Sequence, residues 1–244
     1  MQNENILSLI KQEGVAQNTR QFTFQSDQKI IYRAGQYADY TLINPQYSDE
    51  KGSTRAFSFV SSPDEDVIKI ATRFRQPLSA FKQSLGELRS GDKIKTSQPM
   101  GSFVLHQDVS RPAIFLIGGI GITPIHSIIK DSTQKLSGHK LYLFYGNKNP
   151  EETAFRQDFD QWMKSNKDFQ VIYVFSDEQY NLSEGEKGLI SAQIVKKYIP
   201  EDVINQAYFY ISGPPQMVNT MQRLATDDLS INLDYIKTEE FDGY

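Results

Sequence analysis

The chain has 244 residues and a mass of 27.9 kDa, a length that favours two modest domains over one small one. Hydrophobic residues make up 39% and charged residues 23%, which excludes disordered, collagen-like and low-complexity classes. The absence of cysteine excludes disulfides, thiolate catalysis and cysteine-bound zinc or iron–sulfur centres in these residues, and we expect no metal site. The net charge of -4 provides no basic field that would attract nucleic acid or anionic lipid.

The start of the chain, MQNENILSLIKQEG, lacks a basic segment followed by an apolar one, so it does not resemble a signal peptide. No stretch approaches the roughly 20 apolar residues that a membrane span needs. We therefore expect a cytoplasmic protein without a membrane span.

The first half of the chain predicts short antiparallel strands. Apolar and polar residues alternate in three stretches, at 21–25, 36–40 and 67–74, and Gly, Pro, Asn and Asp clusters separate them. One helix is predicted at residues 79–88, because apolar residues recur there at helical spacing and Ser79 is a suitable N-cap. The pattern predicts an antiparallel β domain over residues 1–108.

The second half alternates between continuous apolar runs and helical patterns. The apolar runs predict strands buried on both faces, at 113–117, 141–145, 171–175 and 207–211. Helices are predicted between and after them, at 124–136, 151–165, 191–197 and 214–226. This order predicts a doubly wound α/β domain with a parallel sheet over residues 109–244.

Two glycine-containing turns follow predicted strands. GGIGITP at 118–124 ends the first buried strand and opens a helix, where backbone N–H groups can bind a diphosphate. SGPP at 212–215 follows the fourth buried strand in the same way, so we expect both turns at one cleft. The alternatives are a tight structural turn for the first and a simple helix start for the second. The first turn is not a GxGxxG fingerprint.

Two further features suggest binding. RAFS at 55–58 places an arginine, an aromatic ring and a hydroxyl where an anion and a flat ring can bind together, and a surface arginine is the alternative. The stretch from 67 to 95 has only two acidic residues and suits phosphates or an acidic protein, unless it is merely a solvated face. Its basic residues are Lys69, Arg73, Arg75, Lys82, Arg89, Lys93 and Lys95. The three histidines, His106, His126 and His139, are expected to be structural.

Together these motifs resemble the flavin-dependent ferredoxin-NADP reductase superfamily. RAFS resembles its flavin motif, GGIGITP its pyridine-nucleotide loop and SGPPQMV at 212–218 its Cys-Gly-Pro-Pro turn. SAFKQSL at 79–85 is similar to its helix beneath the flavin pyrophosphate, and PMGSF at 99–103 is similar to a further segment of the family. The resemblance covers nearly the whole chain and keeps the order of the motifs.

The resemblance implies a six-stranded antiparallel barrel that binds FAD and an α/β domain that binds NAD(P)H. It implies hydride transfer from the nicotinamide C4 to flavin N5, and electron transfer to a separate acceptor such as a ferredoxin or flavodoxin. The basic stretch favours a small acidic redox protein as that acceptor. A non-catalytic nucleotide-binding regulatory or electron-transfer subunit is the alternative, and FMN in place of FAD stays open.

The resemblance also implies roles for single residues. In the flavin site, Arg55 would bind phosphate, Phe57 would stack near the isoalloxazine and Ser58 would hydrogen-bond near N5. A phosphate site would comprise Arg73, Ser79, Ala80 and Phe81. In the nucleotide site, Gly119, Gly121 and Thr123 would hold the diphosphate, and Gly213 and Pro214 would flank the nicotinamide pocket. Phe241 would cover the flavin face, with Tyr244 as an alternative.

Two positions depart from the family pattern. Ser212 stands where many members have cysteine beside the nicotinamide, and the loss of the soft sulfur favours slower hydride transfer. Asp177 stands where NADPH-preferring members have an arginine that grips the 2′-phosphate. A carboxylate at this place favours NADH, because it accepts hydrogen bonds from free ribose hydroxyls. Lys148, after the second buried strand, favours NADPH instead.

Overall fold

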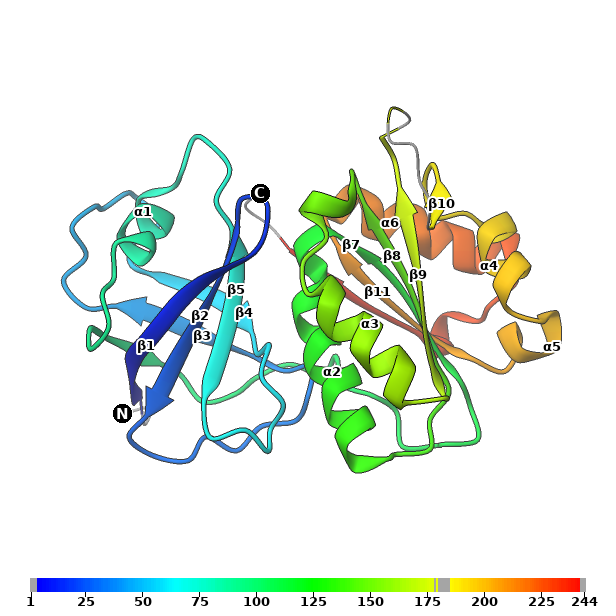
Figure 1. Cartoon of the computed structure of the whole chain (residues 1–244), viewed down its shortest axis with the longest axis horizontal. Coiled ribbons are helices and arrows are strands. Elements are labelled where there is room, and N and C mark those ends of the chain that lie inside the picture. Colours follow the sequence, from blue (N-terminus) through cyan, green and yellow to red (C-terminus); the bar gives the residue numbers. More distant parts are fainter. Residues whose placement is uncertain (1–3, 178, 180–184, 242–244) are drawn as a thin grey trace.

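The computed structural model describes residues 4–177, 179 and 185–241, which form two sheets that lie side by side (Figure 1). The first sheet is antiparallel throughout, with the strand order β4-β3-β6-β1-β2-β5. Its strands are β1 (Asn5–Ala16), β2 (Thr19–Ser26), β3 (Tyr37–Leu42), β4 (Thr54–Ser58), β5 (Ile68–Arg73) and β6 (Lys93–Thr96). The edge strands β4 and β5 approach each other, so the sheet curls into the predicted barrel-like form.

Alternating side chains fill this barrel, as period-two strands require. In β3 every second residue is buried, and Tyr40 packs edge-on against Phe59 at 6.4 Å between ring centroids. Phe81 on helix α1 (Ala80–Gly86) closes one end of the same core. Helix α1 is shorter than the predicted 79–88, because Ser79 is its cap and Glu87 ends it.

The second sheet is parallel throughout, with the strand order β10-β9-β8-β7-β11-β12. Its strands are β7 (Ala113–Gly118), β8 (Leu141–Asn147), β9 (Phe169–Phe175), β10 (Glu186–Lys187), β11 (Tyr208–Gly213) and β12 (Ile236–Glu240). Every residue of β7 is buried, as expected for a central strand that helices cover on both faces.

Helices cover both faces of the parallel sheet (Figure 1). Helices α2 (Ile122–Lys135) and α3 (Arg156–Ser165) pack on the face toward the barrel. The opposite face carries α4 (Ala192–Tyr198), α5 (Glu201–Ile204) and α6 (Pro215–Arg223). This is the doubly wound arrangement that the alternating pattern predicted.

Two of the predicted helices are not continuous α-helices in the structure. The predicted helix 151–165 is a 3₁₀ turn, η2 (Pro150–Glu152), followed by α3, because Phe155 adopts a left-handed conformation with φ of 61° and interrupts the helix. The predicted helix 214–226 is α6, which continues as a π-helical turn at Leu224–Asp228.

Four strands, β1, β6, β10 and β12, were not predicted individually. The second half of β1 is polar and partly exposed, and β12 has no fully buried residue because it lies at a sheet edge. Such strands lack the apolar signal that marks the central ones.

The two sheets share a packed interface. Val60, Ala71 and Phe103 belong to one buried cluster with the residues of α2 and β7. The first sheet's last strand ends at Thr96 and β7 begins at Ala113, so the predicted boundary between residues 108 and 109 falls within the connection and stays a prediction. Within residues 4–177, 179 and 185–241, no helix is both long and apolar enough to cross a membrane.

Candidate functional site

The two glycine turns meet at the point where the strand order of the parallel sheet reverses. The chain adds β8, β9 and β10 on one side of β7, and β11 and β12 on the other, so the turns that follow β7 and β11 are neighbours. A side chain on Gly121 would bring its Cβ to 2.6 Å from the Ser212 carbonyl oxygen and 2.7 Å from the Gly213 nitrogen. Because these atoms belong to the backbone, only glycine permits this approach. The structure therefore brings both turns to one edge, as predicted.

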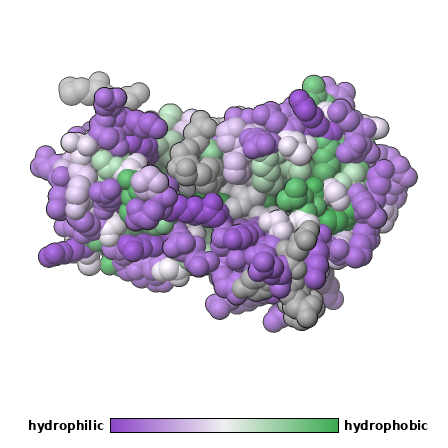
Figure 2. Space-filling view, turned by 90° about the horizontal axis from the view of Figure 1, so that it is seen from above, coloured by the Kyte–Doolittle hydropathy of each residue, from purple (hydrophilic) through white to green (hydrophobic). Residues whose placement is uncertain are grey.

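A cleft of about 620 Å³ opens between the barrel, the start of α2 and the end of β12. Eight of the predicted site residues line it, from segments far apart in the sequence. They are Arg55, Phe57, Ser58, Arg73, Ser79, Phe81, Thr123 and Phe241. The face viewed in Figure 2 is largely hydrophilic, with hydrophobic side chains gathered in a patch over the α/β half.

Strand β4 presents the RAFS motif to this cleft. The Phe57 ring packs 5.8 Å from the Phe81 ring, and the buried Ser58 lines the cleft as well. The Arg55 guanidinium donates to the carbonyl oxygens of Lys51 at 2.8 Å and Gly52 at 3.0 Å, and it lies 5.3 Å from the Phe81 ring. Arg55 thus orders the loop before β4 while remaining in the cleft wall.

The start of α1 forms a second part of the wall. The Ser79 hydroxyl caps the helix by accepting from the Lys82 backbone nitrogen at 3.3 Å. The Ala80 backbone N–H, predicted to bind phosphate, donates to the Asp49 carboxylate at 3.2 Å and does not line the cleft. Lys82 does line it, and burial lowers the pKa of its ammonium.

Arg73 lies at the domain interface. Its side chain is buried, and its guanidinium reaches Glu152 Oε2 at 3.4 Å and Asn147 Oδ1 at 3.4 Å, both on the α/β domain. A Cβ on Gly119 would lie 3.4 Å from the same guanidinium. Arg73 therefore connects the barrel to the first glycine turn, in addition to lining the cleft.

Glu239 is a cleft residue that the sequence analysis did not identify. Burial raises the pKa of its carboxyl to about 7, and its Oε2 atom has no hydrogen-bond partner among the described residues. Glu239 pairs in register with Ser212, whose buried hydroxyl also has no partner in the described chain. Unpartnered polar atoms at a cleft fit a ligand with hydrogen-bonding groups. Identifying Glu239 requires knowing that residues 236–240 form a strand beside β11.

The remaining predicted residues lie outside the cleft lining. Ser212, Gly213, Pro214, Gly119 and Gly121 form the two turns behind it. Asp177 lies beyond the end of β9, where its N–H donates to the Lys148 carbonyl oxygen at 2.9 Å. Thr123, by contrast, lines the cleft, and its hydroxyl donates to the Ile120 carbonyl oxygen at 3.2 Å. Tyr244, the alternative to Phe241, is outside the described residues.

The basic stretch is largely compensated by acids from elsewhere in the chain. Lys69 pairs with Glu65, and Lys95 pairs with Glu4 at 2.8 Å. Arg73 and Arg75 both contact Glu152. The argument from local charge for an acidic partner is weaker than the sequence suggested. No cluster of three or more potential metal-ligating His, Asp or Glu residues occurs in the part of the chain that the structure describes.

Comparisons with known proteins agree with this geometry. Residues 115–223 match the oxidoreductase NAD-binding domain family. One subunit of the Na⁺-translocating NADH-quinone reductase of Idiomarina loihiensis is 30% identical over 216 residues, which cover 82% of this chain and 53% of that protein. The Bacillus subtilis flavohemoprotein is 25% identical over 80% of this chain and 48% of its own length. The chain thus spans about half the length of these curated relatives.

Solved structures share the whole two-domain fold. The flavohem-like FAD/NAD-binding domain of nitric oxide dioxygenase from Vibrio cholerae superposes with a TM-score of 0.84 at 18% identity, covering 97% of this chain and 98% of that one. The ferredoxin NADP⁺ reductase of Neisseria gonorrhoeae, solved with bound FAD and NADP, gives 0.78 at 18% identity, with 97% and 98% covered. The chain thus carries a match to an oxidoreductase NAD-binding domain at residues 115–223 and shares the two-domain fold of these FAD- and NAD(P)-binding proteins.

Proposed function

We propose that this chain binds FAD in the cleft, takes a hydride from NADH and passes the electrons to an acceptor on a separate molecule. The observation that carries the proposal is the cleft itself. It joins the RAFS strand, the capped start of α1 and the end of β12, and its innermost wall touches the α/β domain at Thr123. A flavin in this cleft would lie close to the edge where the two glycine turns meet.

The residues present fit such a ligand. Arg55, Lys82 and the Ser79 cap would hold the phosphates, while Phe57 and Phe241 would contact the ring system. The unpartnered carboxyl of Glu239 would offer a hydrogen bond to the polar edge of the ring. When bound, the flavin supplies hydride acceptance and single-electron release, so the protein contributes placement and electrostatics.

The electron acceptor is proposed by its chemical class. The chain has no cysteine, so these residues cannot hold a cysteine-bound iron–sulfur cluster, and electrons leaving the flavin need another centre. The relatives' names include a component of a quinone reductase and a phenol hydroxylase protein, which indicates that this fold serves unlike electron-accepting systems. We propose a separate redox component as the acceptor, with a small acidic protein as one candidate.

Anaerobic mixing with NADH tests the proposal. The purified protein, loaded with FAD, is expected to be yellow and to bleach when NADH is added in the absence of oxygen. A protein that binds FAD but does not bleach with NADH or NADPH would instead be a non-catalytic electron-transfer or regulatory module. A protein that takes up neither FAD nor FMN would contradict the assignment of the cleft.

The nucleotide preference is tested at Asp177. We expect NADH to be the better substrate, and Asp177→Arg to raise the ratio of kcat/KM for NADPH to that for NADH by about tenfold or more, since arginine binds phosphate in a bidentate manner. Asp177→Asn is the matched control, because it removes the negative charge without adding a phosphate ligand. Equal ratios in wild type and Asp177→Arg would show that the 2′-phosphate does not reach this position.

A further inference from the structure

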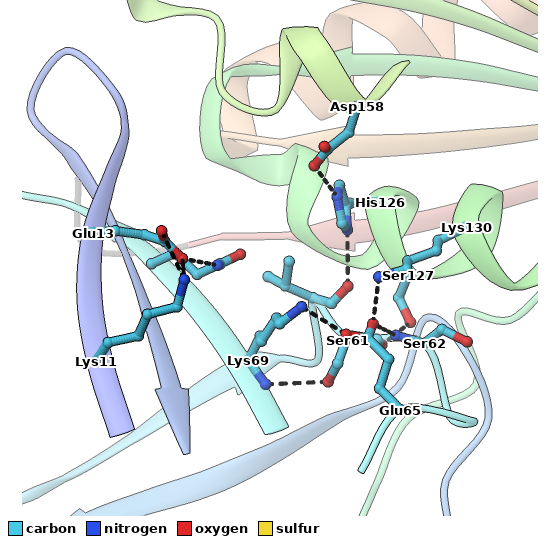
Figure 3. Close-up of polar contacts among 12 residues, drawn as sticks. Lys11, Glu13, Ser61, Ser62, Glu65, Lys69, His126, Ser127, Lys130 and Asp158 are labelled. Carbon is cyan, nitrogen blue, oxygen red and sulfur yellow. Dashed lines mark hydrogen bonds and ion pairs between the residues drawn. The ribbon is translucent and has the colours of Figure 1, made fainter. Parts of the chain in front are cut away.

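Helix α2 is joined to the barrel by a row of polar contacts on one helix face (Figure 3). Its partner is the segment of residues 60–65, which directly follows strand β4. Ser127 Oγ donates to the Ser61 carbonyl oxygen at 2.6 Å, and Lys130 Nζ pairs with Glu65 at 2.8 Å. We call this row the α2 seam. The seam connects the strand that carries Phe57 and Ser58 to the helix that begins at the first glycine turn.

His126 occupies the centre of the seam and is buried, with only 4% of its surface exposed. Its Nδ1 atom lies 2.9 Å from the Val60 carbonyl oxygen, and its Nε2 atom lies 2.9 Å from Asp158 Oδ2 on α3. Figure 3 shows the imidazole between Asp158 on one side and the 60–65 segment on the other. One side chain thus contacts the barrel and a second helix of the α/β domain at once.

Both partners of the imidazole are acceptors. A carbonyl oxygen has no proton to donate, and the hydrogen bond from His126 lowers the pKa of Asp158, so that this side chain is an acceptor-only carboxylate. A neutral imidazole would direct a lone pair at one of these two oxygens. Only an imidazole with a proton on each nitrogen can donate to both oxygens.

The surroundings of the imidazole suit a cation. Asp158 supplies the opposite charge, and the rings of Phe155 and Trp162 lie 4.4 and 4.9 Å from the imidazole, a placement suited to a cation. The Glu65 carboxylate forms ion pairs with the nearby ammonium groups of Lys69 and Lys130. The charged side chains that line the same cleft as His126 are Glu13 of β1, Lys69 of β5, Lys130 of α2, Glu151 of η2, and Arg156 and Asp158 of α3.

We propose that His126 is a positioning residue whose two-proton form holds α2 against the exit of strand β4 and thereby sets the distance between bound flavin and nicotinamide. This proposal rests on the function proposed above. Val60 is two residues beyond Ser58, and His126 is one helical turn beyond Thr123, and both Ser58 and Thr123 line the flavin cleft. A shift at this contact would therefore move the flavin site of the barrel relative to the nucleotide site of the α/β domain. The rate of hydride transfer is sensitive to such shifts.

The proposal makes hydride transfer depend on pH in one direction. An imidazole with a single ring proton cannot donate to both oxygens at once. If Nδ1 keeps its proton, a lone pair faces the Asp158 carboxylate; if Nε2 keeps it, the Val60 contact is lost. The contact is therefore complete at lower pH and weakens at higher pH.

Two independent readouts test the proposal. Trp162 is the only tryptophan of the chain and packs against His126, so its emission reports the imidazole, whose protonated form quenches indole fluorescence. Emission is measured on the FAD-loaded protein without nucleotide, and flavin reduction by NADH is followed by anaerobic stopped flow, both between about pH 5.5 and 9. We expect emission to rise with pH, and we expect the reduction rate constant to fall along the same curve when it is measured in Glu239→Gln, where the cleft carboxyl cannot contribute.

Variants separate positioning from simple support. In Asp158→Asn, the side-chain amide can donate to Nε2 of a neutral imidazole, while Nδ1 donates to the Val60 carbonyl oxygen. Both contacts therefore persist without a second ring proton. We expect its reduction rate to depend less on pH and to exceed that of wild type at the high-pH end. His126→Phe should lose the emission change and slow reduction by about 10- to 100-fold. Ser127→Ala, which loses a seam contact that does not titrate, should keep the wild-type pH profile.

Three outcomes would overturn the inference. Trp162 emission that does not change with pH would contradict the two-proton imidazole. An emission titration without a matching change in the reduction rate would make His126 merely structural. Absence of reduction in wild type at every pH would overturn the proposed function and the positioning role with it, while the emission titration would still decide the protonation state.

Discussion

Replacing Gly121 with alanine is expected to slow NADH-driven flavin reduction by about 100-fold or more while FAD still binds to the barrel. The added methyl group would lie 2.6 Å from the Ser212 carbonyl oxygen, and this atom belongs to the backbone of the second glycine turn. The two turns must then separate, which distorts the edge where the nicotinamide nucleotide would bind. Crowding of this kind also costs about 1–3 kcal/mol in the free energy of unfolding.

The measurement combines flavin content, NADH titration and stopped-flow reduction of the same preparation. Gly14→Ala is the matched control, because a Cβ at Gly14 meets no atom within 4 Å and the residue lies in strand β1, away from both turns. It should reduce its flavin at the wild-type rate. A Gly121→Ala protein with unaltered NADH affinity and reduction rate would show that the nucleotide does not use this edge of the sheet.

Replacing Glu239 with glutamine is expected to change how both stability and flavin reduction depend on pH. Burial raises the pKa of Glu239 from 4.5 to about 7, so the folded protein keeps a proton there that the unfolded chain has already released. Wild-type stability therefore falls as the pH rises through this window. Glutamine carries no such cost, so Glu239→Gln should be more stable than wild type by roughly 2–3 kcal/mol at about pH 8 and nearly equal to it at about pH 4.

Urea unfolding across this pH range measures the stability difference, and stopped flow measures the effect on reduction. The component of the pH–rate profile that titrates near pH 7 should disappear in Glu239→Gln, because the carboxyl in the cleft is gone. Glu240→Gln is the control, since Glu240 is the exposed neighbour that lines the same cleft, so its replacement removes a carboxylate there but keeps Glu239. Identical pH dependence in wild type and Glu239→Gln would mean that this carboxyl is ionised in the folded protein.

Much of the fold was accessible from local pattern. Strand β7 is apolar at nearly every position and β3 alternates, and these two patterns distinguish a parallel sheet buried on both faces from an antiparallel sheet wrapped around a core. Strand β12 and the second half of β1 escaped prediction, because edge and partly exposed strands are held by backbone pairing rather than by apolar side chains. Phe155 broke a predicted helix through its backbone conformation, which residue type does not specify.

Some residues of the candidate site could likewise be identified from local sequence, and others could not. RAFS and both glycine turns were recognisable because their chemistry depends on consecutive residues. Glu239 was not, since a glutamate in a polar strand becomes unusual only when β12 lies beside β11 and buries it. His126 was expected to be structural, and only the packing of α2 on the barrel places its two nitrogens between two acceptors.

Ala80 and Arg73 have partners that the motifs did not predict, and their roles in phosphate binding stay predictions. Both were assigned to phosphate binding, yet the Ala80 N–H donates to Asp49 and the Arg73 guanidinium reaches Glu152 across the domain interface. These partners come from segments that no local pattern connects to the motif. A phosphate at this site would have to compete with Asp49 for the Ala80 N–H.

The sequence by itself determined the two sheet types, the order of the motifs and the resemblance to a superfamily, because periodicity and short glycine turns act within a few residues. The tertiary structure alone decided which polar groups are buried, which are paired and which remain unpartnered. Those properties depend on contacts between segments far apart in the sequence, as between Val60 and His126, and burial of this kind raises the pKa of Glu239 to about 7.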